Sequence, residues 1–569
     1  RLPFRKSALR PLVLLAGRRL YELAVLPYSA LRDADAVCRA LYRMIFSHRN
    51  MLQWQTAADA ERSRPQNTRE YFKALFPCAA FGTIVLAAAV SAAIAAARQI
   101  HNGETAGMAA AGLATAVLWL CAPLIAEKKD EKPDSYRFTA AERGRLTEIF
   151  ADTWQYFEQN CTEKTSWLPP DNFQEEPYRG AAMLTSPTNI GMGLMAVVSA
   201  HDMHLLDERG MFTRLERMVN SIEKLEKWHG HPFNWYNLRD LSLLRPRFIS
   251  TVDSGNLFAC LITTACALAE CAGQAEKTSA EFAEELKKLA ARCTAIARAM
   301  DFSVLYDNTR ELFHIGCSFE EGKLTPSHYD LLASECRLTS FSAIAFSRIG
   351  SEHWFALSRL MCDASGGRVL KSWSGTMFEY LMPLIFFETV PYSMQFEVCR
   401  NAVLTQILAA AAEKPWGVSE SGYYAFDDAL RYQYRAFGNP ELALAPGRMR
   451  SDVIAPYACV LALAVEPKAA AENLRLLCQI GAAGKYGLYE ALDYGAAEKN
   501  GFAIVKSYMA HHQGMSLCAI NNALNNNVLA RRFMSVPEVR ANEQLLFENM
   551  PVDPIRIKTY ESEIFREPH

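Results

Sequence analysis

The chain has 569 residues, with 60 Lys or Arg against 62 Asp or Glu, so its formal charge is only −2. This balance argues against nucleic acid as the main partner, because clustered basic side chains drive that kind of binding. The length allows two or three parts and a large core. The 11% aromatic content would serve that core, and it would also suit a neutral ligand whose rings stack on aromatic side chains.

Cysteines are scattered singly through apolar stretches, and the 15 of them include no C-x-x-C pair. This pattern predicts reduced thiols in a cytosolic protein instead of a disulfide framework or a zinc site. The chain begins with Arg1 and no signal peptide precedes it. We therefore expect it to be a fragment of a longer protein.

Residues 1–73 are basic and amphipathic, with apolar residues at three- and four-residue spacing between Arg and Lys. That spacing favours juxtamembrane helices lying at a membrane surface or against a neighbouring domain. An ordinary soluble helical linker is the alternative.

Two uncharged stretches follow within residues 74–126, namely 74–97 and 105–126, separated by a short polar segment. Each reaches the roughly 20 residues that span a bilayer core, so we predict a transmembrane hairpin. A pair of buried Ala-rich core helices is the alternative. Basic residues precede the first stretch, and EKKDEK follows the second, which places both flanks in the cytoplasm by the positive-inside rule.

Residues 134–548 show one amphipathic helix after another, with little alternating strand signal. We predict an all-α fold, an (α/α)6 toroid in which long loops converge at one end of the ring. No fixed repeat of the kind expected for an α-solenoid is evident. The predicted helices are 139–160, 189–206, 210–228, 254–272, 276–302, 332–350, 377–387, 393–413, 451–465, 468–482 and 503–526.

The segment KPWGVSESGYY, residues 414–424, joins an acidic residue to aromatic and glycine residues. A sugar site needs aromatic faces for the pyranose ring and a carboxylate at the anomeric carbon. Glu420 is the carboxylate in question. The alternative is a helix N-terminus, with Ser419 as the cap and Glu420 in the first turn.

Other segments between the predicted helices carry similar residues: TSPTNIGMG (185–193), FNWYNLRD (233–240), STVDSGN (250–256), YDLLASECRLTSF (329–341), SWSGTMFEYLMP (372–383), YGLYEALDYG (486–495) and SYMAHHQGMS (507–516). Together they supply the inventory of a glycosidase, which uses two carboxylates across one glycosidic bond. The carboxylates are Glu335, Glu379, Glu420, Glu490, Asp253 and Asp330, and the stacking candidates are Trp235, Tyr236, Trp373, Trp416 and Tyr489.

In their order along the chain, these motifs resemble the glycoamylase-like central region of bacterial cyclic β-1,2-glucan synthases, from about residue 20 to about residue 540. The resemblance implies a membrane enzyme whose upstream glycosyltransferase domain extends a β-1,2-glucan and whose downstream phosphorylase-like domain adjusts its length. This region would cyclise the chain. The sequence contains no acidic D-x-D beside a Q-x-x-R-W, so polymerisation is not assigned to it, and residues 549–569 are expected to lead to the downstream domain.

The resemblance further implies roles for two glutamates, with Glu335 as general acid/base and Glu420 as nucleophile. Glu335 comes at the start of a predicted helix, where a low-dielectric site would raise its pKa; a helix-start Glu bonded to backbone is the alternative. Glu379 is either a buried supporting partner or a rival catalyst, and Glu490 is a similar rival.

We predict that the remaining candidates bind substrate. Neutral sugar hydroxyls suit carboxylate and amide groups, and sugar rings suit indole or phenol faces. Arg337 is either a ligand of a sugar hydroxyl or the partner of a nearby Glu. The side chains of adjacent helical residues point about 100° apart, and the sequence has no H-E-x-x-H motif. We therefore predict that His511 and His512 contact substrate or form hydrogen bonds in the core, and do not bind a metal. The substrate-binding candidates are Trp235, Tyr236, Asp253, Asn256, Arg337, Trp373, Glu379, Trp416, Tyr423, Glu490, His511, His512 and Gln513.

The expected function is therefore cyclisation of linear β-1,2-glucan by retaining transglycosylation, without cofactor or metal, at the cytoplasmic face of a bacterial inner membrane. The expected partners are the glucan chain, membrane lipid and the flanking domains, and no nucleic acid. The alternatives are an endo-β-1,2-glucanase and a non-catalytic module that handles glucan.

Overall fold

The computed structural model describes residues 19–48, 68–98, 103–130, 136–388, 390–410, 414–445, 451–496 and 501–549. The chain divides into two compact units, Arg1–Ser135 and Tyr136–His569. Residues 1–18 and 49–67 of the predicted basic segment lie outside the described ranges, as do residues 550–569 of the predicted linker.

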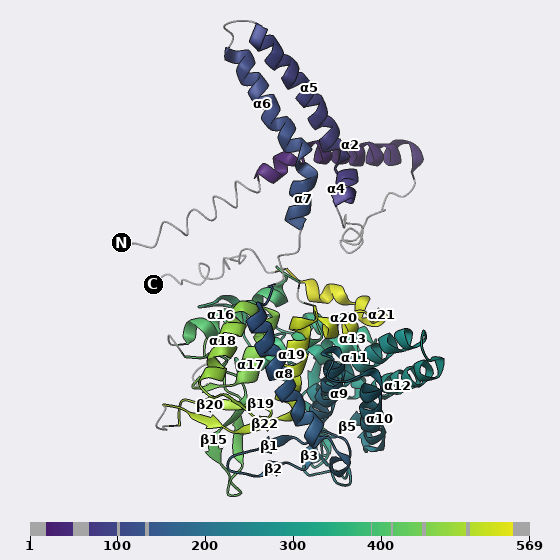
Figure 1. Cartoon of the computed structure of the whole chain (residues 1–569). Helices are drawn as coiled ribbons and strands as arrows, with labels where there is room; N and C mark the ends of the chain where they lie inside the picture. The colour runs from purple at the N-terminus through teal and green to yellow at the C-terminus, as the bar shows by residue number, and fades with distance from the viewer. Residues whose placement is uncertain are drawn as a thin grey trace, which may run out of the picture. The chain divides into compact units, whose positions relative to one another are not determined.

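The first unit is helical (Figure 1). Its helices α5 and α6 run side by side, and a Cβ added at Gly112 would lie 2.9 Å from the Cβ of Ala89. Small residues allow two helices to approach this closely. The helical elements of this unit are α2 (Leu26–Tyr42), η1 (Arg43–Ser47), α4 (Thr68–Ala74), α5 (Phe76–Arg98), α6 (Gly103–Leu120) and α7 (Ala122–Asp130).

Two described helices are long and apolar enough to cross a membrane: Phe76–Ala97, within α5, and α11 (Thr251–Ala275) of the second unit. They differ in burial, since 83% of the α11 window is buried inside the structure against 17% of the α5 window. Helix α11 is therefore a core helix of its own unit. Helix α6 contains a shorter apolar stretch, Ala106–Leu120.

The second unit is helix-rich, and polar side chains cap several of its helices. Thr139 and Glu142 form a capping box at the start of α8, and the hydroxyl groups of Ser186 and Ser250 accept hydrogen bonds from the N–H groups of Asn189 in α9 and Asp253 in α11. The helices are α8 (Ala140–Asn160), α9 (Pro187–Asp202), α10 (Glu208–Lys224), α11 (Thr251–Ala275), α12 (Ala280–Arg298), α13 (Arg337–Ala345), α14 (Glu352–Ala356), α15 (Met377–Leu381), α16 (Met394–Ala409), α17 (Pro456–Leu461), α18 (Pro467–Gln479), α19 (Ala510–Leu524), α20 (Val528–Met534) and α21 (Pro537–Arg540), with 3₁₀ turns η2 (Glu163–Thr165), η3 (Phe302–Leu305), η4 (Met382–Ile385), η6 (Ala462–Ala464) and η7 (Glu543–Phe547).

Helices α9, α11 and α19 form the centre of the core and are buried over most of their length. Motif glycines let these helices approach their neighbours. A Cβ at Gly514 of α19 would lie 2.5 Å from the Cβ of Met192 of α9, and one at Gly255 of α11 would lie 1.9 Å from Thr339 Oγ1 of α13. The glycines of these motifs therefore serve packing.

Short antiparallel strands fill the segments between helices, so the prediction of an all-α fold is corrected to a helix-rich fold with small sheets. Most strands have only two to four residues, which is too short for a period-two pattern of apolar residues to be recognised in the sequence. The pairs and sheets are β1 (Asn172–Gln174) with β2 (Gly180–Ala181) and β22 (Ser507–Met509); β3 (Leu184–Thr185) with β6 (Tyr236–Asn237); β4 (Lys227–Trp228) with β5 (His231–Pro232); β7 (Phe248–Ser250) with β10 (Gly316–Ser318) and β11 (Lys323–Leu324); β8 (Tyr306–Asp307) with β9 (Leu312–His314) and β12 (His328–Tyr329); β13 (Met361–Ala364) with β14 (Gly367–Leu370); β15 (Ser421–Phe426) with β16 (Tyr432–Arg435); β17 (Val453–Ile454) with β20 (Ala491–Asp493) and β21 (Ala503–Val505); and β18 (Ala483–Gly484) with β19 (Gly487–Leu488).

Three predicted helices were too long at their N-termini. Residues 453–454 form β17, which pairs with β20. Residues 503–505 form β21, which also pairs with β20, and residues 507–509 form β22, which pairs with β1. The helix predicted over 332–350 begins only at Arg337 and ends at Ala345. In each case the first residue of the helix is set by strand pairing or by a turn that precedes the helix. Local periodicity of apolar residues does not report on either.

Strands lead directly into helices at one end of the unit. β3 precedes α9, β7 precedes α11 and β22 precedes α19, and the labels β1, β2, β3, β15 and β22 gather at this end in Figure 1. Three of the polar motifs, residues 185–193, 250–256 and 507–516, therefore lie at the N-termini of α9, α11 and α19.

Candidate active site

Hydrogen bonds join the motifs across large sequence separations. The Thr188 hydroxyl of α9 donates to Asp253 Oδ1 of α11 at 2.5 Å. Asn189 of α9 lies 3.2 Å from His511 of α19, measured from Oδ1 to Nδ1. The first turns of three core helices thus form one polar cluster.

Glu420 lies immediately before β15, so the alternative of a helix N-terminus with Ser419 as its cap is wrong. Its Oε1 accepts a hydrogen bond from the Tyr434 hydroxyl at 2.8 Å, and its backbone oxygen accepts one from Tyr457 at 3.0 Å. Burial raises the pKa of Glu420 to about 7, the Tyr434 hydrogen bond opposes that rise, and the carboxylates of Glu379, Glu490 and Asp253 add to it. A half-buried carboxyl with this pKa can change its ionisation near neutral pH.

Glu335 is half-buried and lies two residues before α13, among buried neighbours. Burial raises the pKa of its carboxyl to about 8, and repulsion from Glu379 and Glu420 adds to the rise. The Ser334 hydroxyl donates to Glu335 Oε2 at a long 3.4 Å. A carboxyl group that is protonated at neutral pH can act as a general acid.

Glu490 and His512 form a buried pair. His512 Nδ1 lies 3.0 Å from Glu490 Oε2, and the N–H of Gly422 donates to Glu490 Oε1 at 2.9 Å. The His512 ring stacks on Tyr457 with centroids 3.7 Å apart and an interplanar angle of 10°. Burial raises the pKa of Glu490 to about 7 and lowers the pKa of His512 well below its usual value. Since both of its oxygens are engaged, Glu490 is better suited to holding His512 than to attacking substrate.

His511 belongs to a chain of contacts that begins at the buried Asp171. Asn189 Nδ2 donates to Asp171 Oδ1 at 2.8 Å, and Asn189 Oδ1 lies 3.2 Å from His511 Nδ1. On the other side of the ring, His511 Nε2 lies 3.4 Å from the Tyr434 hydroxyl. His512 Nε2 also lies 3.4 Å from that hydroxyl. Tyr434 is the point at which both histidines and Glu420 meet.

The ring nitrogens of the two histidines come close to one another and to Glu420. Despite their adjacent positions on a helix, ligand atoms of Glu420, His511 and His512 all lie within 4.8 Å of one another, a spacing that could hold a metal ion. In this structure the Tyr434 hydroxyl lies within hydrogen-bond distance of all three residues.

Glu379 caps helix α15 with its carboxylate, which accepts hydrogen bonds from Ser372, from the backbone N–H of Ser374 and from Thr376. Burial raises its pKa, and the backbone donors oppose this. Arg337 donates to the backbone oxygens of Glu379 and Tyr380. Arg337 is 3% exposed, its guanidinium holds the backbone of α15, and no ion pair joins it to a carboxylate among the described residues.

Asp253 and Asn256 share one partner. The Thr188 hydroxyl accepts a hydrogen bond from Asn256 Nδ2 at 3.2 Å and donates its own proton to Asp253. The buried Asn256 Oδ1 has no hydrogen-bond partner among the described residues. Because Asn256 is itself buried, the half-buried Asp253 is the one of the two that is accessible to a sugar hydroxyl.

The predicted aromatic and amide contacts divide into exposed and core positions. Trp373 is 46% exposed, and Trp235 and Tyr423 are half-buried. Tyr236 is fully buried and its hydroxyl donates to Glu226 O, so it is a core residue and not a stacking surface. Trp416 is also buried, with its backbone bonded to Asn473, and Gln513 donates to Leu488 O in the core. Of these side chains, only Trp373, Trp235 and Tyr423 are exposed or half-buried, and so accessible to a ligand.

Sequence reasoning missed Tyr434 and Tyr457, which organise Glu420, and Thr188 and Asn189, which connect the helices. Thr188 and Asn189 stood inside a quoted motif, TSPTNIGMG. Tyr434 had a weaker signal, namely the alternation of Tyr432 and Tyr434 in what proves to be strand β16.

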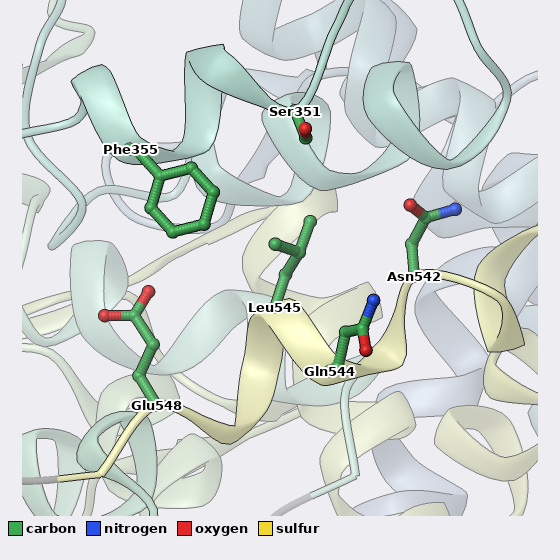
Figure 2. Close-up of a pocket in the computed structure, with 6 residues that line it drawn as sticks. All are labelled: Ser351, Phe355, Asn542, Gln544, Leu545 and Glu548. Atoms are coloured by element: carbon green, nitrogen blue, oxygen red, sulfur yellow. The ribbon is translucent and has the colours of Figure 1, made fainter. Parts of the chain in front are cut away.

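A cavity of about 330 Å³ lies elsewhere in the second unit, between α14 and η7 (Figure 2). None of its lining residues is a candidate site residue: they are Ser351, Phe355, Asn542, Gln544, Leu545 and Glu548. The Glu548 carboxylate accepts hydrogen bonds from Trp354 and Arg359. It therefore fixes the segment after η7 to the unit.

Two family models match the second unit. The Glycoamylase model, a glucoamylase family, matches residues 327–537, and DUF3131, a family of unknown function, matches residues 149–256. Together they contain Glu335, Glu420, Glu490 and the α9 and α11 motifs.

One curated relative is the cyclic β-(1,2)-glucan synthase NdvB of Rhizobium meliloti (strain 1021), which is 32% identical over 94% of this chain. The chain spans 23% of that relative's length. The predicted resemblance to a cyclic β-1,2-glucan synthase is thereby confirmed.

Among solved structures, the endo-β-1,2-glucanase from Chitinophaga pinensis, in complex with sophorotriose and glucose, has a TM-score of 0.57 and 18% identity, covering 72% of this chain and 99% of its own. The β-1,2-glucanase from Parabacteroides distasonis has a TM-score of 0.57 and 16% identity, covering 72% of this chain and 60% of its own. At these identities the likeness establishes the fold.

Proposed function

We propose that this chain cyclises linear β-1,2-glucan by retaining intramolecular transglycosylation, as one region of a cyclic β-1,2-glucan synthase. The observation that carries the proposal is the arrangement of two carboxyl groups: Glu420, hydrogen-bonded to Tyr434, and Glu335, whose pKa is raised by burial and by the charge of Glu420. The relative that matches 94% of the chain supports the substrate and the product.

In the first step, a Glu420 oxygen attacks the anomeric carbon of an internal glucose, and the bond from that carbon to the leaving 2-oxygen breaks. Glu335 gives its proton to that oxygen, so no alkoxide leaves. Tyr434 orients the attacking carboxylate, and the product of this step is a glycosyl-enzyme ester.

In the second step, the 2-hydroxyl at the far end of the same glucan chain attacks the anomeric carbon of the glycosyl-enzyme, and the bond from that carbon to the Glu420 oxygen breaks. Glu335, now ionised, takes the hydroxyl proton, and Glu420 leaves as a carboxylate. The ring is released and both glutamates return to their starting protonation. Ring closure exceeds hydrolysis only where the acceptor end is held at an effective concentration above the roughly 55 M of water, which oriented intramolecular reactions attain.

The remaining polar groups would bind the substrate. The half-buried Asp253 suits a sugar hydroxyl, and Trp235, Trp373 and Tyr423, which are half-buried or exposed, suit sugar rings. The Glu490–His512 pair and His511 would hold Tyr434 and its neighbours in place.

The test uses Glu420→Gln and Glu335→Gln with linear β-1,2-glucan, and mass spectrometry of the products. A ring has one water less than the linear chain of the same length, so mass alone separates cyclisation from hydrolysis. We expect each variant to lose at least about 10³-fold in ring formation. The exposed Glu163, changed to Gln, is the matched control and should leave the rate unchanged.

Each alternative predicts a different product. Linear fragments from the wild-type chain, without rings, would indicate an endo-β-1,2-glucanase, and the anomer first formed would show whether it retains or inverts. Absence of any product would favour a non-catalytic module that handles glucan. Starch serves as a second substrate, because the matching family model carries a glucoamylase name.

The fold and membrane assignments belong to the same proposal. We assign residues 134–548 to an (α/α)6 toroid, 74–126 to a transmembrane hairpin, 1–73 to basic juxtamembrane helices and 549–569 to a linker. The apolar, mostly unburied Phe76–Ala97 and the apolar stretch of α6 support the hairpin. The catalytic unit would face the cytoplasm of a bacterial inner membrane, between a glycosyltransferase and a phosphorylase-like domain. Retention of the chain in membranes after an alkaline wash, and its release when residues 74–126 are deleted, would test the hairpin.

A further inference from the structure

A cluster of two histidines and one aspartate lies on the three-stranded sheet β12-β9-β8, whose central strand is β9. His328 on β12 pairs directly with His314 on β9, and Asp307 on β8 pairs with Leu312. Leu312 and His314 are two residues apart on one strand, so their side chains share a face. The register therefore places one potential metal ligand from each strand on the same face of the sheet.

Side-chain geometry agrees with the register. The ligand atoms of Asp307, His314 and His328 all lie within 4.8 Å of one another. The two imidazole rings have centroids 4.3 Å apart, and His328 Nε2 lies 3.2 Å from Asp307 Oδ2. The cluster is half-buried, with His328 8% and Asp307 22% exposed at the side chain.

We propose that Asp307, His314 and His328 bind one divalent transition-metal ion, for which Zn²⁺ is the best match. Two imidazoles and one carboxylate are ligands that Zn²⁺ uses, and three protein ligands leave a fourth position for water or a substrate oxygen. Harder ions such as Mg²⁺ and Ca²⁺ prefer shells of oxygen atoms and fit this set poorly.

His314 is already oriented as a ligand. Its Nδ1 lies 2.6 Å from the backbone oxygen of Thr325, so Nδ1 carries the proton and Nε2 keeps its lone pair. Metal-binding histidines usually donate their other ring N–H to such a carbonyl or to a carboxylate, which fixes both tautomer and ring orientation.

Asp307 is held in a similar way. Its Oδ1 accepts the backbone N–H groups of Thr309 and Arg310, which leaves Oδ2 for the cluster. The competing cation is Arg310, whose Nε lies 4.0 Å from Oδ2 and whose side chain is 67% exposed. An exposed pair at this distance contributes little, so it would not prevent a metal from binding.

The other face of the sheet contacts the core. Phe313, which alternates with His314, is fully buried, and its cross-strand partners are Tyr306 and Tyr329. Burial and the nearby charges of Cys336, Glu335, Asp253 and Glu420 raise the pKa of Tyr329. A metal joining the three strands would thus fix β12, which leads from the cluster into the segment that carries Glu335.

The test is Zn²⁺ binding to the full chain, measured by titration calorimetry under reducing conditions. A Cys38→Ser background removes an exposed thiol that would itself bind Zn²⁺. We expect one Zn²⁺ per chain, and binding at least about 100-fold weaker in His314→Asn and Asp307→Asn. Both changes are matched to the structure. In His314→Asn the amide N–H can still donate to Thr325 O, and in Asp307→Asn the amide oxygen can still accept the backbone N–H groups of Thr309 and Arg310.

Two control variants locate the site. His204→Asn changes an exposed histidine whose φ of +60° Asn tolerates, and it should leave binding unchanged. His511→Asn removes a ligand of the alternative cluster at Glu420 and should also leave binding unchanged. Loss of binding in His511→Asn with retention in His314→Asn would overturn the proposal.

A measurement on the chain without these substitutions guards against variants that fail to fold. Zn²⁺ should raise the thermal midpoint of the Cys38→Ser chain, because an ion that binds only the folded state stabilises it, whereas Mg²⁺ should not. No binding of Zn²⁺ at micromolar concentration, or equal binding in His314→Asn and Asp307→Asn, would show that the cluster is not a metal site.

Discussion

The Tyr434 hydroxyl donates a hydrogen bond to Glu420 Oε1 at 2.8 Å, joining the strand β16 to the residue that precedes β15. The two strands pair with Gly422 opposite Tyr434, so the hairpin itself brings the phenol beside the carboxylate. This bond favours the ionised form of Glu420, which is the nucleophilic form.

Tyr434→Phe should therefore raise the pKa of Glu420 above its present value of about 7 and slow ring formation by about 10-fold or more. The reason is that the carboxylate loses its donor while its burial is unchanged. The measurement is the pH dependence of the rate, in which the acidic limb should move to higher pH in the variant. An unchanged limb with a reduced rate would mean that Tyr434 contributes only to substrate binding.

The wild-type rate should depend on pH at both ends. Glu420 must be ionised, which gives a limb near pH 7, and Glu335 must be protonated, which gives a limb near pH 8. Activity should therefore be highest between these values and fall on either side. A rate that stays level from pH 8 to pH 10 would exclude Glu335 as the acid.

The raised pKa of Glu335 also affects stability. In the unfolded chain this carboxyl ionises near pH 4.3, whereas in the folded chain it stays protonated to about pH 8, so the folded state binds more protons between these values. The free energy of unfolding should then fall as pH rises through this window. Glu335→Gln, which cannot ionise, should raise the thermal midpoint by roughly 1–2 °C at pH 9 and by less at pH 5. An equal change at both pH values would show that ionisation is not the cause.

The packing of α11 against α13 gives a prediction that does not depend on the function. Gly255→Ala would place a Cβ 1.9 Å from Thr339 Oγ1 and 2.5 Å from its Cβ, and should lower the free energy of unfolding by about 1–3 kcal/mol. The control is Gly273→Ala on the same helix, where no atom lies within 4 Å of the added Cβ. Because Ala favours helix over Gly, it should be neutral or stabilising by up to about 1 kcal/mol. Chemical denaturation of both variants tests the comparison, and equal stabilities would contradict it.

Much of the second unit could be predicted from local sequence. Helices α8, α10, α12 and α18 bear apolar residues at helical spacing on one side, and their predicted bounds were close to those of the structure. Prediction failed where partners outside the segment set the conformation. Residues 503–509, which pair with β20 and β1, and Glu420, which precedes a strand instead of a helix, are the main examples.

Composition and motif spacing are enough to identify which segments carry glutamate, histidine, aromatic and glycine residues, and which stretches are apolar enough for a core or a membrane. How these residues are used depends on the folded structure. In the folded chain Tyr236 and Gln513 are buried, and Arg337 donates to the backbone of α15. Tyr434 donates to Glu420 and lies beside His511 and His512. The physical reason is that burial and hydrogen-bond partners are set by contacts between residues far apart in the chain, whereas composition and periodicity report only on neighbours.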